Sequence, residues 1–595
     1  MPIRVASFDG TLNSGRITGM KKFISFDLRG ALLPLWFLAF SQPIYATTFK
    51  VTTSEELQAA LSTAASNGGD DEILLAPGTY FGSFKYFSEE DFALKITSEL
   101  EDNPSIIDAQ KQNFGFYIEG NRTRANVELS NLVIRNAFSV AQGGGLLTRS
   151  LYGSLLLDRI VLVGNTAREG GGLYAANVGK LILSRSILRN NVAAYFNPDG
   201  SEASTAQGGG ASLRNVADVD LQSSAFEENR GDSGGALFLS NQSYEMPWAS
   251  TRRVSVRGLN FLRNDSGTLF HLSVTGSGNS ELTIEDNYFV KNVDRSNGLL
   301  WIDAYETPIN LASNVFVDNE CRAIALRVQL DGPNNAANEL LVEENTFTNN
   351  SGCKWFYLES LSDRSNHRAI IRGNLLQGNV LGFRADRSGF ERLSLFNNTF
   401  VGFDEPSYAS FGSDFEMTVA NNIFYSQVYE TGFELRGVLK KGILKNNIYQ
   451  NVTGYWDVDE GNQSLDPKFF DVEGSDFHLS PDSPAIDAGD NSFVSEANAT
   501  DLDGNPRVGN SLVDIGAYER ETSSLHPADI NGDQAISQSE FDNYNAAWRT
   551  NEMWTVAPEV IPVDFVTRAG FLLQKGGTYN NIGVGKPQTW VPIND

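Results

Sequence analysis

The chain has few of the residues from which metal sites and nucleophile sites are most often built. Its 595 residues include only two cysteines and four histidines. Two cysteines exclude a disulfide-dense scaffold and a cysteine-rich zinc cluster. The histidines are scattered along the sequence, so their spacing supports neither a zinc site nor a serine–histidine–aspartate triad. They are His271, His367, His478 and His526.

Basic residues are scarce relative to acidic ones. The chain has 46 Lys and Arg against 73 Asp and Glu, a formal net charge of −27. A surface of this sign repels phosphates, so we expect no nucleic-acid partner. Cations and neutral sugars remain open as partners, whereas an acidic polysaccharide would need local Arg, Lys or bound cations.

Long apolar runs are also missing. The best candidate, ALLPLWFLAF (31–40), has ten residues, too few to span a bilayer. It follows the basic MKKF at Met20 and precedes SQPIYA, which ends at Ala46, as in a secretory signal peptide. We therefore expect an extension and signal peptide over 1–46 and a secreted or cell-surface protein without a transmembrane segment.

A nine-residue repeat is what the sequence has in abundance. Twelve copies lie between residues 129 and 452, with starts 24 to 38 residues apart, and IEDNYFVKN (284–292) is one of them. Short β-type runs without helical patterns between them predict a solenoid of stacked coils. The apolar sixth residue of each copy should form an internal column.

The fourth residue of the repeat is asparagine in seven successive copies. Asparagine tolerates the left-handed turn conformation, and stacked amides can hydrogen-bond along the coil axis. We therefore expect these asparagines to be structural. They are Asn287, Asn314, Asn345, Asn374, Asn398, Asn422 and Asn447.

The repeat resembles the right-handed parallel β-helix of pectin-lyase-like proteins. With QGGGLL, EGGGLY and SGGALF, it also resembles the repeats of polymorphic outer-membrane proteins. The resemblance implies an all-β, right-handed parallel β-helix of about twelve coils over 47–464. A helix in TSEELQAALSTAA, with a capping box from Thr53 to Glu56, would cover its first coil. Activity does not follow, because the fold hosts lyases, hydrolases, adhesins and inert spikes.

The segment 465–520 resembles the choice-of-anchor Q module of exported bacterial proteins. LDPKF, DFHLSPDSPAIDAG, DLDGNPRVG and VDIGAYE carry this resemblance, which implies surface or extracellular deployment. Asp501 and Asp503 in DLDG have the chemistry to bind calcium. We favour a polar turn there, because no glutamate stands at the twelfth position.

A calcium loop is predicted in DINGDQAISQSEF (529–541), within a helical C-terminal module over 521–595. Gln534 stands where glycine is usual and must adopt a strained turn that costs about 1 kcal/mol. The loop lacks an entering helix and so resembles one half of a dockerin, which implies a docking partner. The predicted ligands are Asp529, Asn531 and Asp533 through side chains, Ala535 through its carbonyl, Ser537 through water, and Glu540.

Strands between the repeat copies alternate between apolar and polar residues, as in LLWIDAY (299–305) and KWFYLES (354–360). Their outward residues should form one stripe suited to sugars. For catalysis, Arg384 near Asp386 and Asp303 is the best trio, a cationic base beside carboxylates. The glycan-binding candidates are Trp301, Tyr305, Arg327, Trp355, Tyr357 and Glu359.

Three functions remain open for this stripe. It binds glycan or mediates attachment, it belongs to a polysaccharide lyase or glycoside hydrolase, or it is the solvated face of a structural stalk. For the stripe alone the sequence favours the solvated face. For the chain as a whole we favour glycan binding or attachment over catalysis, because no lyase or hydrolase motif matches the sequence.

The two cysteines follow the terminal asparagines of neighbouring copies by two or three residues. Adjacent coils are about 4.8 Å apart, which is within disulfide range. Because export favours oxidation, we predict a Cys321–Cys353 bridge between adjacent coils. A stacked pair of reduced thiols is the alternative.

Overall fold

The computed structural model describes most of the chain from Ala46 onward. The described residues are 46–196, 202–241, 253–276, 280–322, 324–332, 337–360, 366–378, 382–385, 390–402, 407–411, 415–425, 433–436, 439–449, 456–480, 482–495, 499–508, 512–520, 525–531, 533–554, 560–581 and 587–593. The expected signal peptide therefore lies outside them except for its last residue, Ala46.

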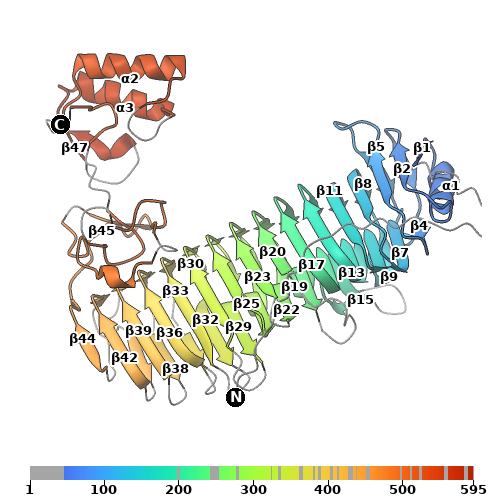
Figure 1. Ribbon diagram of the computed structural model, residues 1–595, viewed down its shortest axis with the longest axis horizontal. Coiled ribbons are helices and arrows are strands. Elements are labelled where there is room, and N and C mark those ends of the chain that lie inside the picture. The colour runs from blue at the N-terminus through green and yellow to red at the C-terminus, as the bar shows by residue number, and fades with distance from the viewer. Residues whose placement is uncertain are drawn as a thin grey trace, which may run out of the picture. The chain divides into compact units, whose positions relative to one another are not determined.

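A parallel β-solenoid dominates the described chain, as predicted (Figure 1). The strand pairings along its first sheet are parallel and in unbroken order. This first sheet comprises β1 (Thr47–Val51), β2 (Asp71–Leu75), β5 (Leu94–Ser98), β8 (Val127–Arg135), β11 (Ser154–Val163), β13 (Leu173–Ser184), β17 (Ala211–Gln222), β20 (Arg253–Arg257), β23 (Glu281–Glu285), β26 (Ile309–Ala312), β30 (Glu339–Glu343), β33 (His367–Arg372), β36 (Phe390–Phe396), β39 (Phe415–Ala420), β42 (Leu439–Lys445) and β44 (Val458–Glu460).

A second sheet of short strands follows the first around a corner. Its members are β3 (Thr79–Phe81), β6 (Ser105–Asp108), the ends of β8 and β11, β14 (Ile187–Arg189), β18 (Ala225–Glu227), β21 (Asn260–Leu262), β24 (Tyr288–Val290), β27 (Val315–Val317), β31 (Thr346–Thr348), β34 (Leu375–Gln377), β37 (Thr399–Val401), β40 (Ile423–Tyr425) and β43 (Ile448–Tyr449). Each repeat copy spans the corner between these two sheets, and β1, β2, β5 and β44 extend the first sheet beyond the copies.

A third sheet completes the coils. It comprises β4 (Phe84–Phe87), β7 (Phe116–Thr123), β10 (Leu146–Leu151), the first halves of β13 and β17, β19 (Arg230–Asn241), β22 (Asp265–Thr275), β25 (Val293–Tyr305), β29 (Ile324–Asp331) and β32 (Lys354–Ser360). Further strands are β9 (Phe138–Gln142), β12 (Thr166–Glu169), β15 (Val192–Phe196), β16 (Glu202–Thr205), β28 (Glu320–Cys321), β35 (Gly382–Ala385), β38 (Ser407–Phe411) and β41 (Phe433–Arg436).

Two stacked arrays hold the corner between the first and second sheets. The phenylalanines at the sixth repeat position form the predicted column, with ring centroids 4.3 Å apart from Phe289 to Phe316 and from Phe316 to Phe347. The asparagines at the fourth position are buried, and each amide donates to the next, as from Asn314 to Asn345 at 2.9 Å. Both features were predicted and both are confirmed.

The asparagines at the fourth position do not themselves adopt the left-handed turn conformation that the sequence led us to expect of them. The left-handed residue of each corner lies one position earlier, as at Asp286 (φ +57°), Ser313 (φ +53°) and Glu344 (φ +55°). A second asparagine ladder, at the ninth repeat position, was not predicted. In it, Asn292 Nδ2 donates to Asn319 Oδ1 at 3.0 Å, and both side chains are buried.

The first coil is covered by α1 (Ser54–Ala64), which has the predicted capping box from Thr53 to Glu56. Its Leu57 and Leu61 are fully buried in the solenoid core. Farther along, Cys321 and Cys353 are joined by a disulfide, with Cα atoms 4.7 Å apart.

The segment after the last coil packs against the outside of the second sheet. Phe469 in β45 (Phe469–Asp471) and Phe477 in β46 (Asp476–Leu479) share an apolar cluster with Val401 and Ile423. The carboxylate of Asp501 is buried and accepts the backbone N–H of Asn505 at 2.7 Å and of Glu519 at 2.8 Å. DLDG therefore forms a polar turn, the alternative that we favoured.

The C-terminal module has its own small core. It contains α2 (Gln538–Thr550), α3 (Val563–Gln574), β47 (Tyr579–Asn581) and β48 (Trp590–Pro592). Tyr544, Leu572 and Trp590 are buried in it. Among the residues described, no helix is both long and apolar enough to cross a membrane.

Candidate functional site

The predicted stripe lies on the outer face of the third sheet. Leu300, Ile302 and Leu326 are buried, whereas Trp301 and Arg327 are partly exposed, so the predicted inward and outward faces are correct. Strand register brings together the outward residues of β25, β29 and β32. These include six predicted residues: Trp301, Asp303, Tyr305, Arg327, Tyr357 and Glu359.

Three predicted residues cannot be placed in this stripe. The side chain of Trp355 in β32 lies outside the described residues, as does that of Arg384 in β35. Asp386 lies outside them altogether. The proposed catalytic trio therefore reduces to Asp303, whose partners are described next.

Trp301 is stacked between two neighbours. The His271 ring lies parallel to it, with centroids 4.6 Å apart, and the Arg327 guanidinium lies 4.5 Å from its ring. These neighbours come from β22 and β29, which pair with opposite edges of β25. Both faces of the indole are thus covered, and a sugar ring has no face of Trp301 on which to stack.

The polar groups beside this stack bond to one another. Trp301 Nε1 donates to Asp303 Oδ1 at 2.7 Å, and Gln329 Nε2 donates to Glu359 Oε2 at 2.6 Å. Arg327 forms an ion pair with Glu359 at 3.6 Å. Such contacts rigidify the stripe and use much of its capacity for binding sugar hydroxyls.

A histidine that sequence spacing left isolated lies in this stripe. His271 Nε2 is 3.3 Å from Asp303 Oδ2, and His271 Nδ1 is 2.7 Å from Ser233 Oγ. The three residues come from the successive strands β19, β22 and β25. The alternation in LFHLSV (269–274) indicates that His271 points outward, but sequence alone could not align it with the other two residues.

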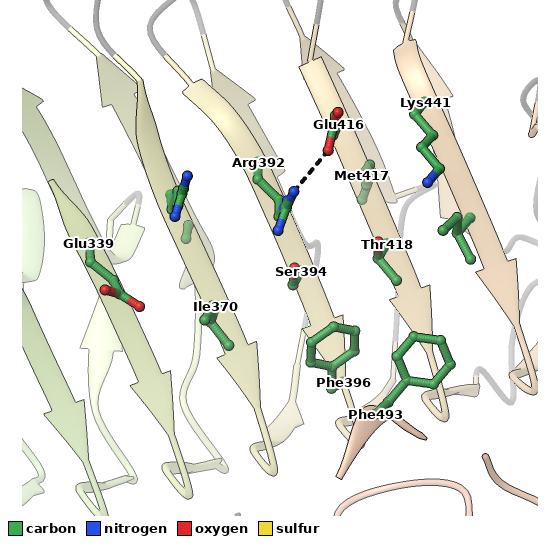
Figure 2. Close-up of a pocket in the computed structure, with 13 residues that line it drawn as sticks. Glu339, Ile370, Arg392, Ser394, Phe396, Glu416, Met417, Thr418, Lys441 and Phe493 are labelled. Carbon is green, nitrogen blue, oxygen red and sulfur yellow. Dashed lines mark hydrogen bonds and ion pairs between the residues drawn. The ribbon is translucent and has the colours of Figure 1, made fainter. Parts of the chain in front are cut away.

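A groove of about 440 Å³ lies on the outer face of the first sheet, across β30, β33, β36, β39 and β42 (Figure 2). Charged side chains from successive strands form one wall. Aliphatic and hydroxyl side chains form the floor, and two phenylalanines form the other wall. Figure 2 shows Glu339, Arg392, Glu416 and Lys441 in the wall, Ile370, Ser394 and Thr418 in the floor, and Phe396 with Phe493 as the aromatic pair. Strand register adds Arg368 to the wall and Ile443 to the floor.

The aromatic wall joins distant parts of the sequence. Phe493 belongs to η1 (Asn491–Phe493), and its ring centroid lies 5.3 Å from that of Phe396. The residue before η1, Asp490, donates its backbone N–H to Asn421 Oδ1 at 2.8 Å and forms an ion pair with Lys445 at 2.7 Å. These contacts fix Phe493 against the solenoid.

The charged wall carries both donors and acceptors. Arg392 pairs with Glu416 at 3.1 Å, and Arg368 pairs with Glu391 at 2.9 Å. Both guanidinium side chains remain about half exposed, at 49% and 54%. Because a guanidinium has five N–H donors, each pair leaves donors directed at the groove or at solvent.

The residues of the predicted calcium loop have the oxygen donors that a calcium ion needs. Asp533 N donates to Asn531 Oδ1 at 2.9 Å, Ala535 N donates to Asp533 Oδ1 at 3.0 Å, and Gln534 has φ +59°, the strained turn expected there. These turns gather hard oxygen donors, which calcium prefers. In this structure the Glu540 carboxylate accepts a hydrogen bond from Ser537 N at 2.9 Å.

Acidic groups alone do not mark this loop as a metal site. Across the ranges that the structure describes, no group of three or more His, Cys, Asp and Glu side chains is arranged to hold a metal. The predicted set also relies on an amide, a carbonyl and a water-mediated serine. Calcium binding thus stays a prediction.

No protein-family model and no curated protein matches the chain. Three solved structures resemble its architecture. An alginate lyase from Paenibacillus sp. shares 14% identity (TM-score 0.25), covering 59% of this chain and 97% of the lyase. Pectate lyase Pel9A shares 13% (TM-score 0.28), covering 80% and 98%. A PL6 alginate lyase in complex with a trisaccharide shares 13% (TM-score 0.35), covering 70% and 88%. Similarity at this level assigns neither an activity nor a substrate.

Proposed function

We propose that this chain is an exported, glycan-binding β-solenoid whose binding site is the groove on the first sheet. The main support for this proposal is the make-up of the groove. A charged wall faces the aromatic wall of Phe396 and Phe493, and the floor between them includes two hydroxyl side chains. Phenylalanine rings cover the apolar faces of sugars, and arginine and glutamate exchange hydrogen bonds with their hydroxyls.

The charge of the groove favours a neutral glycan. Its wall carries three cationic side chains, those of Arg368, Arg392 and Lys441. Three carboxylates lie beside them: Glu339 and Glu416 line the groove, and Glu391 pairs with Arg368. The positive and negative groups therefore balance locally. Since the whole chain has a net charge of −27, a polyanion would also meet long-range repulsion.

The groove is also elongated along the coil axis, as a binding site for a polymer would be. Its charged residues occupy matching positions on consecutive strands, from Glu339 through Arg368 and Arg392 to Lys441. Adjacent strands lie about 4.8 Å apart, so five strands offer a site on the order of 20 Å long. A glycan chain lying along the coil axis would meet the same kinds of side chain on each coil.

The C-terminal module supplies attachment in this proposal. Calcium bound by Asp529, Asn531, Asp533, Ala535, Ser537 and Glu540 would order the loop between the start of the module and α2. The surrounding helices would then present a rigid surface to a docking partner at the cell surface or in the extracellular matrix.

Retention on a panel of insoluble neutral and acidic polysaccharides tests the proposal. Phe493→Ala and Arg392→Ala should each reduce retention of the mature chain at least about tenfold, as expected for the loss of about 1.4 kcal/mol. Arg295→Ala, which removes an exposed ion pair with Asp265, is the matched control and should bind like wild type.

Two results would contradict glycan binding at the groove. One is retention that is unchanged in both groove variants. The other is the absence of retention on every polysaccharide in the panel. Release of reducing ends or unsaturated products during the same incubation would instead identify a hydrolase or a lyase.

A further inference from the structure

Ser233, His271 and Asp303 form a hydrogen-bonded relay on the outer face of the third sheet. Ser233 Oγ lies 2.7 Å from His271 Nδ1, and His271 Nε2 lies 3.3 Å from Asp303 Oδ2. We propose that this relay makes Ser233 a nucleophile and that the chain hydrolyses carboxylic esters there. The inference is independent of glycan binding at the groove.

The hydrogen bonds place the protons as a general base requires. An ionised carboxylate only accepts, so His271 Nε2 carries the proton that Asp303 accepts. The lone pair of Nδ1 then faces the Ser233 hydroxyl, which donates to it. A base held by a third group and within reach of the nucleophile is the arrangement by which serine is activated.

The surrounding residues hold the imidazole in place. Trp301 stacks on the His271 ring, and Phe238 meets it edge-on with centroids 5.2 Å apart. Trp301 Nε1 also donates to Asp303 Oδ1 at 2.7 Å. Asp303 and Trp301 therefore act as positioning residues for His271.

Ser233 differs from the residues at the same corner of the preceding coils. Those residues are Gln142, Glu169 and Gln207, each followed by a glycine with positive φ, as Ser233 is by Gly234 (φ +63°). Gln142 accepts a hydrogen bond from Arg149 at 2.6 Å, and Gln207 accepts one from Arg214. Among these corners, a hydroxyl meets an imidazole only at Ser233.

The chemistry balances with water as the only co-reactant. Ser233 Oγ attacks the ester carbonyl while its proton passes to His271 Nδ1, and the alcohol leaves as it takes that proton. Water then attacks the acyl-serine, gives a proton to the same nitrogen, and the carboxylic acid departs as Oγ regains a proton. His271 is neutral before and after each half-reaction.

An active-site probe and a simple ester test this on the full mature chain. A fluorophosphonate should label Ser233, as peptide mass spectrometry would show, and p-nitrophenyl acetate should be hydrolysed. Ser233→Ala should abolish labelling. His271→Gln should lower the hydrolysis rate about 100-fold or more, the usual worth of a general base.

The control is Ser273→Ala, because Ser273 lies beside Asp303 on the same face. It should be labelled and should react like wild type. Melting curves of all variants check folding. Failure of the probe to label folded wild type would overturn the proposal, and so would wild-type hydrolysis rates in folded Ser233→Ala or His271→Gln.

Discussion

The hydroxyl of Tyr579 donates a hydrogen bond to Oδ2 of Asp529 at 2.7 Å, across fifty residues of sequence. An antiparallel bridge between Ala535 and Thr578 lies beside it. The predicted calcium loop is therefore supported by the segment that follows α3. Ordering of the loop by calcium should stabilise the whole C-terminal module.

Calcium is expected to raise the unfolding temperature of this module in the full chain. At a calcium concentration about 100 times the Kd, linkage adds about 2.7 kcal/mol to the stability of the folded state. Asp529→Ala should abolish the calcium effect, whereas Asp542→Ala, an exposed change outside the loop, should preserve it. Calorimetry with calcium and with a chelator measures the unfolding temperature under the two conditions. Identical unfolding curves for wild type would refute calcium binding.

The imidazole of His478 should titrate far above those of the two buried histidines, His367 and His526. Burial lowers the pKa of His478, but hydrogen bonds to Asp476 and Asp503 outweigh it and raise the pKa to about 9. Burial lowers the pKa of His367 and of His526 to about 4. With only four histidines in the chain, NMR of labelled imidazoles can follow each one.

The stability of the region around His478 should fall as the pH rises. Below the unfolded pKa of about 6.5, histidine is charged in both states and the folded state gains the full stabilisation from its carboxylate partners. That gain is lost as the pH rises through about 9. Burial also raises the pKa of Glu519 to about 9, and its ionisation in the unfolded state lowers stability in the same direction.

Melting curves from pH 6 to 9 measure this dependence. We expect wild type to lose at least about 3 °C over that range, on the scale of 1 kcal/mol. Asp503→Asn should reduce the loss, because it removes one of the two partners that favour the charged imidazole. A melting temperature that rises with pH would show that the sign is wrong.

Removal of one amide from the asparagine ladder should destabilise the solenoid. Asn345 donates to Asn374 at 3.0 Å and accepts from Asn314 at 2.9 Å, with all three side chains buried. Asn345→Ala leaves buried partners unsatisfied and should cost about 1–3 kcal/mol. Asn260→Ala, on an exposed side chain of β21, should cost far less in the same denaturant titration.

The disulfide should stabilise the coils that it joins. Cys321 and Cys353 are 32 residues apart, and closure of a loop of this size is worth about 3–4 kcal/mol in the chain-entropy model. Mass spectrometry of the non-reduced, alkylated protein should find one linked peptide pair. Two alkylated cysteines in the folded protein would contradict the pairing.

The solenoid could be predicted because its determinants repeat in sequence. Phe316 and Asn314 occur at fixed positions in a nine-residue copy, so their burial and stacking follow from the pattern alone. The left-handed turn at Gln534 is local in the same way, because it lies at a fixed position in the loop that starts at Asp529. Which residues of the stripe point outward was also predictable, because apolar and polar residues alternate along each strand and this pattern does not depend on the neighbouring strands.

The sites themselves depend on register and on distant segments. Copies start at irregular intervals, so sequence could not align Ser233, His271 and Asp303 on three successive coils. The groove requires Phe493, which reaches Phe396 only because the segment after the last coil folds back onto the second sheet. The covered faces of Trp301 likewise appear only once its neighbours are placed.

Hydrogen–deuterium exchange with a retained oligosaccharide tests the central claim most directly. Glycan binding at the groove predicts slower exchange in the first-sheet strands 368–372, 392–396 and 416–420 and around Phe493. Exchange in 299–305 on the third sheet should stay unchanged. Protection confined to the third sheet, or no protection at a saturating concentration of ligand, would contradict the assignment of the groove as the binding site.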